Sequence, residues 1–159
     1  MKIYIETSVV SFWFDRKPHN RDKRRSVRRF LLLCRKEVHV GYVSRLVRAE
    51  IEQSKPGYRE QDLRLIGRIG LGDLPYDSRA LLDLVQAYRQ DPLLRRAPEA
   101  DLAHIAVYCL SDVNALATMN LRHVANQVIL EKVRKVNHGH GIQKEVVVAP
   151  PEAFLPPRS

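Results

Sequence analysis

Glu50 is the strongest candidate for a functional residue in this sequence. It lies in the apolar stripe of a helix predicted to begin at Ser44, beside Leu46, Val47 and Ile51. A buried carboxylate needs an ion pair, a network of hydrogen bonds or a metal ion, because an unpaired buried charge is strongly unfavourable. No cation is expected near Glu50 from the helix pattern, which favours the metal ion.

Two further acids support a metal site. Glu6 follows the apolar run 3–5, and Asp101 opens a mostly apolar helix that reaches Leu110. Three carboxylates from separate elements could therefore converge. On the residues alone, simpler interpretations stay open: Asp101 complements a helix dipole, Glu50 extends to water, and Glu6 is an ordinary strand end.

Short apolar strands and helices alternate along the chain. Strands are predicted at 2–5, 38–43, 113–117 and 146–148, and helices at 7–14, 21–37, from Ser44, around 63–69, around 81–88 with Asp77 as cap, at 98–110 and at 121–139. This order predicts an α/β fold with a central parallel sheet of about four to five strands flanked by helices. Ligands of such sheets bind at the carboxyl ends of strands, where Glu6 and Thr118 lie.

Composition suggests one domain and a polyanionic partner. The chain has 159 residues, of which 45% are hydrophobic, and a net charge of +9. We expect one domain over 1–150, a Pro-rich tail at 151–159, and two reduced core cysteines. The sequence shows no long apolar span, which favours nucleic acid over a membrane as the partner. It shows no secretory signal, so we expect a cytoplasmic protein.

A basic cluster on the predicted helix 21–37 is the best candidate for contact with RNA. Its members share two helical turns and would follow a phosphate backbone: Lys23, Arg24, Arg25, Arg28 and Arg29. Contacts of this kind give affinity that falls with salt and little sequence preference. A solvated helix face is the alternative.

Several blocks of the sequence resemble one known family. The opening IYIETSVVS, the block DLAHIAVYCL followed by ALATMNLRHVAN, and the ending VNHGHGIQKEVVVAPPEAF are similar to PIN domains, in particular to the subgroup of VapC-like toxin ribonucleases. The resemblance implies an endoribonuclease that depends on Mg²⁺ or Mn²⁺, with Glu6, Glu50 and Asp101 as metal ligands. It also implies an RNA substrate and a homodimer, and either an antitoxin protein as partner in a toxin–antitoxin pair or an unpaired relative of such toxins.

Two departures from the family pattern define the alternative. The first acid is usually Asp but is Glu6 here, and a fourth acidic position corresponds to Asn120. Asn120 stays in the candidate catalytic set, and Thr7, Ser8, His104 and Thr118 are candidates for orienting the acids. A degenerate PIN domain that binds RNA or a protein without cutting is the alternative function.

Overall fold

Five parallel strands form the central sheet of the protein. The computed structural model describes residues 1–157, and its strands run in the order β3–β2–β1–β4–β5. Their bounds are β1 (Lys2–Ile5), β2 (Val40–Ser44), β3 (Gly72–Leu74), β4 (Ala115–Ala117) and β5 (Val148–Ala149). Every neighbouring pair is parallel, which confirms the predicted α/β class and central parallel sheet.

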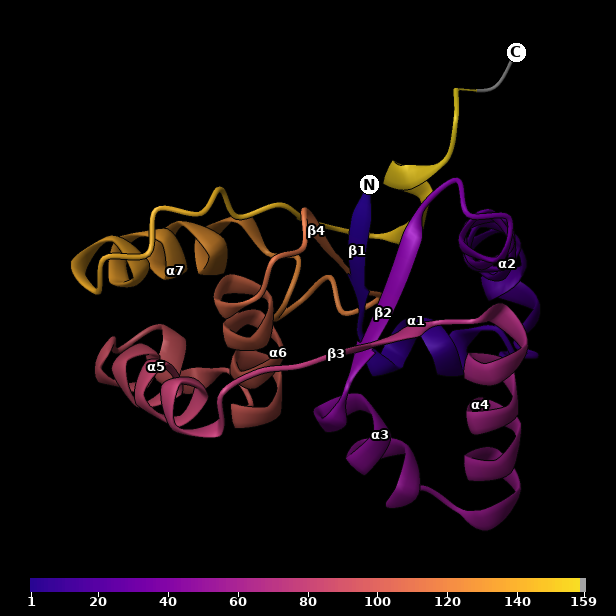
Figure 1. Cartoon of the computed structure of the whole chain (residues 1–159), viewed down its shortest axis with the longest axis horizontal. Coiled ribbons are helices and arrows are strands. Elements are labelled where there is room, and N and C mark those ends of the chain that lie inside the picture. Colours follow the sequence, from indigo (N-terminus) through magenta and orange to yellow (C-terminus); the bar gives the residue numbers. More distant parts are fainter. Residues whose placement is uncertain (158–159) are drawn as a thin grey trace.

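Helices cover both faces of this sheet. In Figure 1, α2 and α4 lie on one side of the strands, and α5, α6 and α7 lie on the other. The helices are α1 (Thr7–Phe12), α2 (Arg21–Arg35), α3 (Arg45–Glu52), α4 (Pro56–Ile69), α5 (Ser78–Gln90), α6 (Glu99–Leu110) and α7 (Gln127–Gly139). Short 3₁₀ turns occur at Pro18–Asn20 (η1), Leu94–Arg96 (η2) and Pro151–Phe154 (η3).

The central strand β1 explains the position of Glu6. Ile3, Tyr4 and Ile5 are fully buried, as expected for a strand that is covered on both faces. The chain then turns directly into α1, so Glu6 lies at the carboxyl end of the strand. Two predicted helix caps are also confirmed, because the Ser44 and Asp77 side chains accept hydrogen bonds from the first turns of α3 and α5.

The helix predicted over 121–139 is wrong in its first part. Helix α7 begins only at Gln127, because the Asn126 side chain accepts from the backbone N–H groups of Val128 and Ile129. The preceding segment instead turns around Asn120, whose carbonyl accepts from two later backbone N–H groups. Leu121 and Val128, two apolar residues within the predicted range, are exposed.

The other differences are one strand that the sequence does not predict and the ends of two helices. Strand β3 was not predicted, because its three residues follow a glycine-rich break in which Gly70 has a left-handed φ of 79°. Helix α2 ends at Arg35 rather than Glu37, whose φ is 59°. Helix α6 begins at Glu99, with Pro98 as its cap instead of its first residue.

The segment after β5 packs on the protein rather than extending from it. Phe154 of η3 lies 5.6 Å from Phe30 of α2 between ring centroids. The last two residues of the predicted Pro-rich tail, Arg158 and Ser159, lie outside the described residues. Within residues 1–157, no helix is both long and apolar enough to span a membrane.

Candidate metal and hydrolytic site

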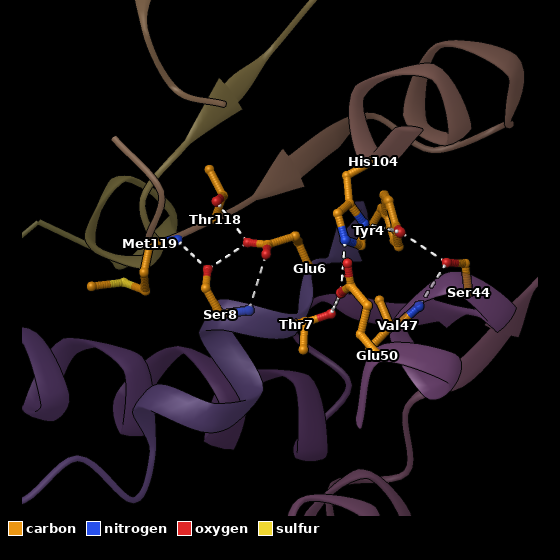
Figure 2. A network of polar contacts seen from close by, with 10 residues as sticks. All are labelled: Tyr4, Glu6, Thr7, Ser8, Ser44, Val47, Glu50, His104, Thr118 and Met119. Atoms are coloured by element: carbon orange, nitrogen blue, oxygen red, sulfur yellow. Dashed lines mark hydrogen bonds and ion pairs between the residues drawn. The ribbon is translucent and has the colours of Figure 1, made fainter. Parts of the chain in front are cut away.

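Glu6 is fixed in place by three hydrogen bonds. Its carboxylate caps α1 by accepting from the Ser8 backbone N–H at 3.1 Å, and it also accepts from the Ser8 and Thr118 hydroxyls. The Thr118 contact measures 2.7 Å and joins the ends of β1 and β4. Glu6 is therefore a buried carboxylate with a defined orientation, as Figure 2 shows.

The same hydroxyls bind the loop that follows β4. Ser8 Oγ accepts from the Met119 backbone N–H at 2.9 Å, and Thr118 Oγ1 accepts from the Asn120 backbone N–H at 2.9 Å. Each hydroxyl thus donates to Glu6 and accepts from the loop. This explains why Ser8 after β1 and Thr118 after β4 occur together at the site.

Asp101 lies in the first turn of α6 and is close to Asn120. Burial raises the pKa of Asp101, and so does the negative charge of Glu6, whereas a hydrogen bond with the Asn120 side chain lowers it. Asn120 Oδ1 in turn accepts from the His123 backbone N–H at 3.1 Å. The structure therefore brings Glu6, Asp101 and Asn120 to one edge of the sheet.

Glu50 contacts a different set of residues. Its Oε2 lies 3.0 Å from His104 Nε2 and also accepts from the Thr7 hydroxyl. The side chain is 27% exposed, so Glu50 is neither fully buried nor without a basic partner, and both expectations from the sequence are corrected. His104 comes from α6, 54 positions away, which is why the helix pattern around Glu50 could not reveal it.

A buried chain of hydrogen bonds extends from His104 to Ser44. His104 is 1% exposed, and its Nδ1 lies 2.7 Å from the Tyr4 hydroxyl, which lies 2.8 Å from Ser44 Oγ. If Nε2 carries the hydrogen, His104 donates to Glu50, Tyr4 donates to Nδ1 and Ser44 donates to Tyr4. Ser44 Oγ also accepts from the Val47 backbone N–H, so this tautomer leaves no donor unused.

The network sets the charge state of Glu50. Burial alone would raise the pKa of Glu50, but the hydrogen bonds from His104 and Thr7 and the electrostatic attraction of His104 outweigh it. The pKa of this carboxyl is therefore lowered, and Glu50 stays ionised at neutral pH. Tyr4 is a phenol, because burial raises its pKa well above the ordinary value.

The predicted residues thus fall into two neighbouring groups. One contains Glu6, Ser8, Asp101, Thr118 and Asn120, and the other joins Glu50 to Thr7 and His104. Among residues 1–157, no three acidic, histidine or cysteine side chains are close enough together to hold a metal ion.

The predicted RNA-contact residues belong to α2. A groove of about 860 Å³ beside this helix is lined by four of the five, Arg24, Arg25, Arg28 and Arg29, together with Arg21. Arg24 and Arg28 also donate to the backbone carbonyls of Asp15 and Trp13, so these two have structural contacts. Lys23 does not line the groove.

Sequence reasoning missed Tyr4, Ser44 and Asp62 as polar residues of interest. Tyr4 resembles an ordinary core residue of a strand, although a buried tyrosine hydroxyl needs a partner. Asp62 could have been found, because it precedes Leu65, Ile66 and Ile69 at the spacing of a buried helix face.

In comparisons with known proteins, no family model, curated protein or solved structure matches this chain.

Proposed function

We propose that the protein is a metal-dependent endoribonuclease that hydrolyses RNA phosphodiester bonds. The observation that carries this proposal is the pair of carboxylates, Glu6 and Asp101, which come from different elements and interact at the carboxyl edge of a parallel sheet. The basic surface of α2 and the net charge of +9 favour a polyanionic substrate. The resemblance to VapC-like PIN domains agrees with this chemistry.

The pair of Glu6 and Asp101 suits a hard divalent cation. These two side chains offer carboxylate oxygens, with the Asn120 amide beside Asp101, and Mg²⁺ and Mn²⁺ prefer oxygen ligands. Glu50, in the neighbouring group, would have to leave His104 and Thr7 to become a third ligand. The charge of Glu6 raises the pKa of Asp101, so a cation between these side chains would relieve an existing repulsion. When bound, the ion would supply a water of lowered pKa and offset the charge that develops on the phosphate.

The protein's own groups have a positioning role in this proposal. Ser8 and Thr118 fix the carboxylate of Glu6, and Thr7 and His104 fix that of Glu50. Both acids therefore keep their orientation without the substrate, which reduces the cost of assembling a site. The same hydroxyls couple the loop after β4 to the end of β1.

The direct test is cleavage of a mixed RNA pool. Cutting is expected with Mn²⁺ or Mg²⁺ and is expected to stop when EDTA removes the metal. Cutting that persists at full rate in EDTA would contradict a metal-dependent reaction. RNA binding without cutting under all conditions would favour the second candidate function.

That second candidate is a degenerate PIN-like domain that binds RNA or a protein without catalysis. It is favoured by the commitment of Glu50 to His104 and Thr7, which separates this acid from the pair of Glu6 and Asp101. In either function, an acidic antitoxin is a suitable protein partner for the basic face of α2, and a homodimer is proposed from the family resemblance.

The groove beside α2 predicts how RNA binding depends on salt. Replacing Arg21, Arg25 and Arg29 by Gln removes three charges while keeping the structural contacts of Arg24 and Arg28. The slope of log affinity against log salt is expected to fall by about 2, since each phosphate contact on a single strand contributes about 0.7. Binding measured by fluorescence anisotropy over a salt series checks this.

A matched control separates position from net charge. Arg79, Arg95 and Arg96 are exposed residues of α5 and η2, and their replacement by Gln removes the same charge. This control is expected to change the slope much less. Equal slopes in the two triple variants would place the RNA track elsewhere.

A further inference from the structure

A pocket lies next to the carboxylate site, between α1 and α4. Its volume is about 620 Å³, within the usual range of about 300–1,000 Å³ for small-molecule sites. Ser8, which donates to Glu6, is part of its wall. A group bound in the pocket would therefore lie beside the proposed hydrolytic site.

Asp62 is an unusual component of this wall. The residue is 3% exposed, and its Oδ2 accepts from the Ser11 hydroxyl at 2.8 Å. Its Oδ1 has no hydrogen-bond partner among residues 1–157. Burial raises the pKa of Asp62 more than the Ser11 hydrogen bond lowers it. A buried acceptor without a donor is unfavourable, so a ligand whose N–H groups reach this oxygen, by displacing the side chains that cover it, would satisfy it.

The second acid of the pocket does not have this property. Asp15 accepts from the Lys17 backbone N–H at 2.9 Å and from the Asn20 side chain at 3.2 Å, one donor on each oxygen. Of these two acids, only Asp62 therefore has a carboxylate oxygen, Oδ1, without a hydrogen-bond donor among residues 1–157.

The rest of the wall suits a flat base. Phe12, Phe14 and Tyr58 contribute aromatic side chains to the wall, Tyr58 is well exposed, and Lys55 adds a positive charge at the same pocket. Single-stranded RNA is commonly recognised by stacking of bases on aromatic side chains and by hydrogen bonds to their Watson–Crick edges. Charge, acceptor and aromatic faces thus occur together.

The chemistry of the acceptor discriminates among bases. Guanine presents N1–H and N2–H side by side and can donate both to one carboxylate, whose oxygens each have two lone pairs. Adenine and cytosine offer a single amino group beside a ring acceptor. Uracil places carbonyl oxygens on both sides of its one N–H, and a carboxylate repels them.

We propose that this pocket binds a guanine base of the RNA next to the cleaved bond, with Asp62 accepting from its N1–H and N2–H groups. The inference rests on the proposed ribonuclease function and adds a substrate preference to it. Lys55 lies where a phosphate of the same strand would be favoured.

Calorimetric titration with mononucleotides tests the pocket without requiring cleavage. In EDTA, guanosine monophosphate is expected to bind at least about tenfold tighter than adenosine monophosphate, because one hydrogen bond to a charged group is worth that factor or more. Inosine monophosphate, which lacks the N2 amino group, is expected between them. All three carry the same phosphate, so a general attraction to Lys55 cancels.

Two variants locate the selectivity. Asp62→Asn keeps an oxygen for the Ser11 hydroxyl but replaces an acceptor by an amide, and it is expected to lose the preference for guanine. Tyr58→Ala, at an exposed position, is expected to weaken all three nucleotides by about tenfold through lost stacking. Glu60→Gln, an exposed acid of α4 outside the pocket wall, is the control with unchanged binding. Equal affinities for the three nucleotides, or an unchanged guanine preference in Asp62→Asn, would overturn the inference.

Mapping of cleavage sites distinguishes this inference from the function on which it rests. Metal-dependent cutting next to guanine that loses this preference in Asp62→Asn supports both. Cutting without any base preference, together with unselective nucleotide binding, overturns the guanine pocket and leaves the nuclease standing. Selective binding that depends on Asp62, without cutting, supports the pocket and contradicts the nuclease.

Discussion

The rate of RNA cleavage is expected to fall by about 100-fold or more in the Asp101→Ala variant. A loss of this size is found when one preorganised group that stabilises a transition state is removed. Asp101 is the acid that interacts with both Glu6 and Asn120, so its removal leaves Glu6 without its carboxylate neighbour. The rate of Mn²⁺-dependent cutting of the RNA pool is the measurement.

Stability separates this functional role from a structural one. The pKa of Asp101 is raised by burial and by Glu6, so ionisation of this acid disfavours the folded state above its ordinary pKa of 3.8. In EDTA at neutral pH, Asp101→Ala is therefore expected to unfold no more easily than the wild type. Loss of cleavage accompanied by loss of folding would contradict the functional assignment.

Asp83→Ala is the matched control. Asp83 is an exposed acid within α5, so the control removes the same side chain from another helix. Its cleavage rate is expected to equal that of the wild type. An equal loss in both variants would show that general charge, rather than the position of Asp101, determines activity.

The sheet and the position of Glu6 at the end of its central strand were accessible from sequence because both follow from local patterns. The run Ile3–Ile5 favours a strand that is covered on both faces, and Glu6 lies at the end of this strand. Strand β3 has only three residues and almost no apolar pattern, so its pairing with β2 decides its structure.

Long-range pairs were not accessible in the same way. A helix pattern shows that Glu50 faces inward, but the partner His104 comes from another helix and depends on how α3 and α6 meet. Residues 121–126 show a helical spacing of apolar residues, yet the side chain of Asn126 caps α7, so the helix begins only after this residue. Local caps and distant partners thus account for the main differences between prediction and structure.

His104→Phe is expected to lower the free energy of unfolding by about 3 kcal/mol, because it leaves buried polar partners unpaired. Phenylalanine has a similar shape, so little of the loss comes from a cavity. Tyr4 and Ser44 are fully buried and lose the acceptor at the end of their chain, and Glu50 loses one of its two donors. Urea unfolding in EDTA measures the change. The control is His138→Phe, at an exposed position of α7, which is expected to change the free energy of unfolding by no more than about 0.5 kcal/mol.

A double-mutant cycle with Tyr4→Phe tests whether the chain acts as one unit. The combined variant is expected to lose less than the sum of the single losses, by about 1 kcal/mol, because the second change removes a hydroxyl that the first has already left unpaired. Strict additivity would mean that Tyr4 and His104 contribute independently, contrary to the 2.7 Å contact between them.

The pH dependence of the same variants has a definite sign. The folded-state pKa of Glu50 is lowered below 4.5, so its contribution to stability is present above that pH and is lost as pH falls through the folded value. His104→Phe removes the main donor responsible, so its deficit relative to the wild type is expected to be full at pH 7 and to shrink below about pH 4.5. A deficit that stays constant down to pH 3 would show that the loss arises from Tyr4 and packing, and that His104 does not stabilise the charge of Glu50.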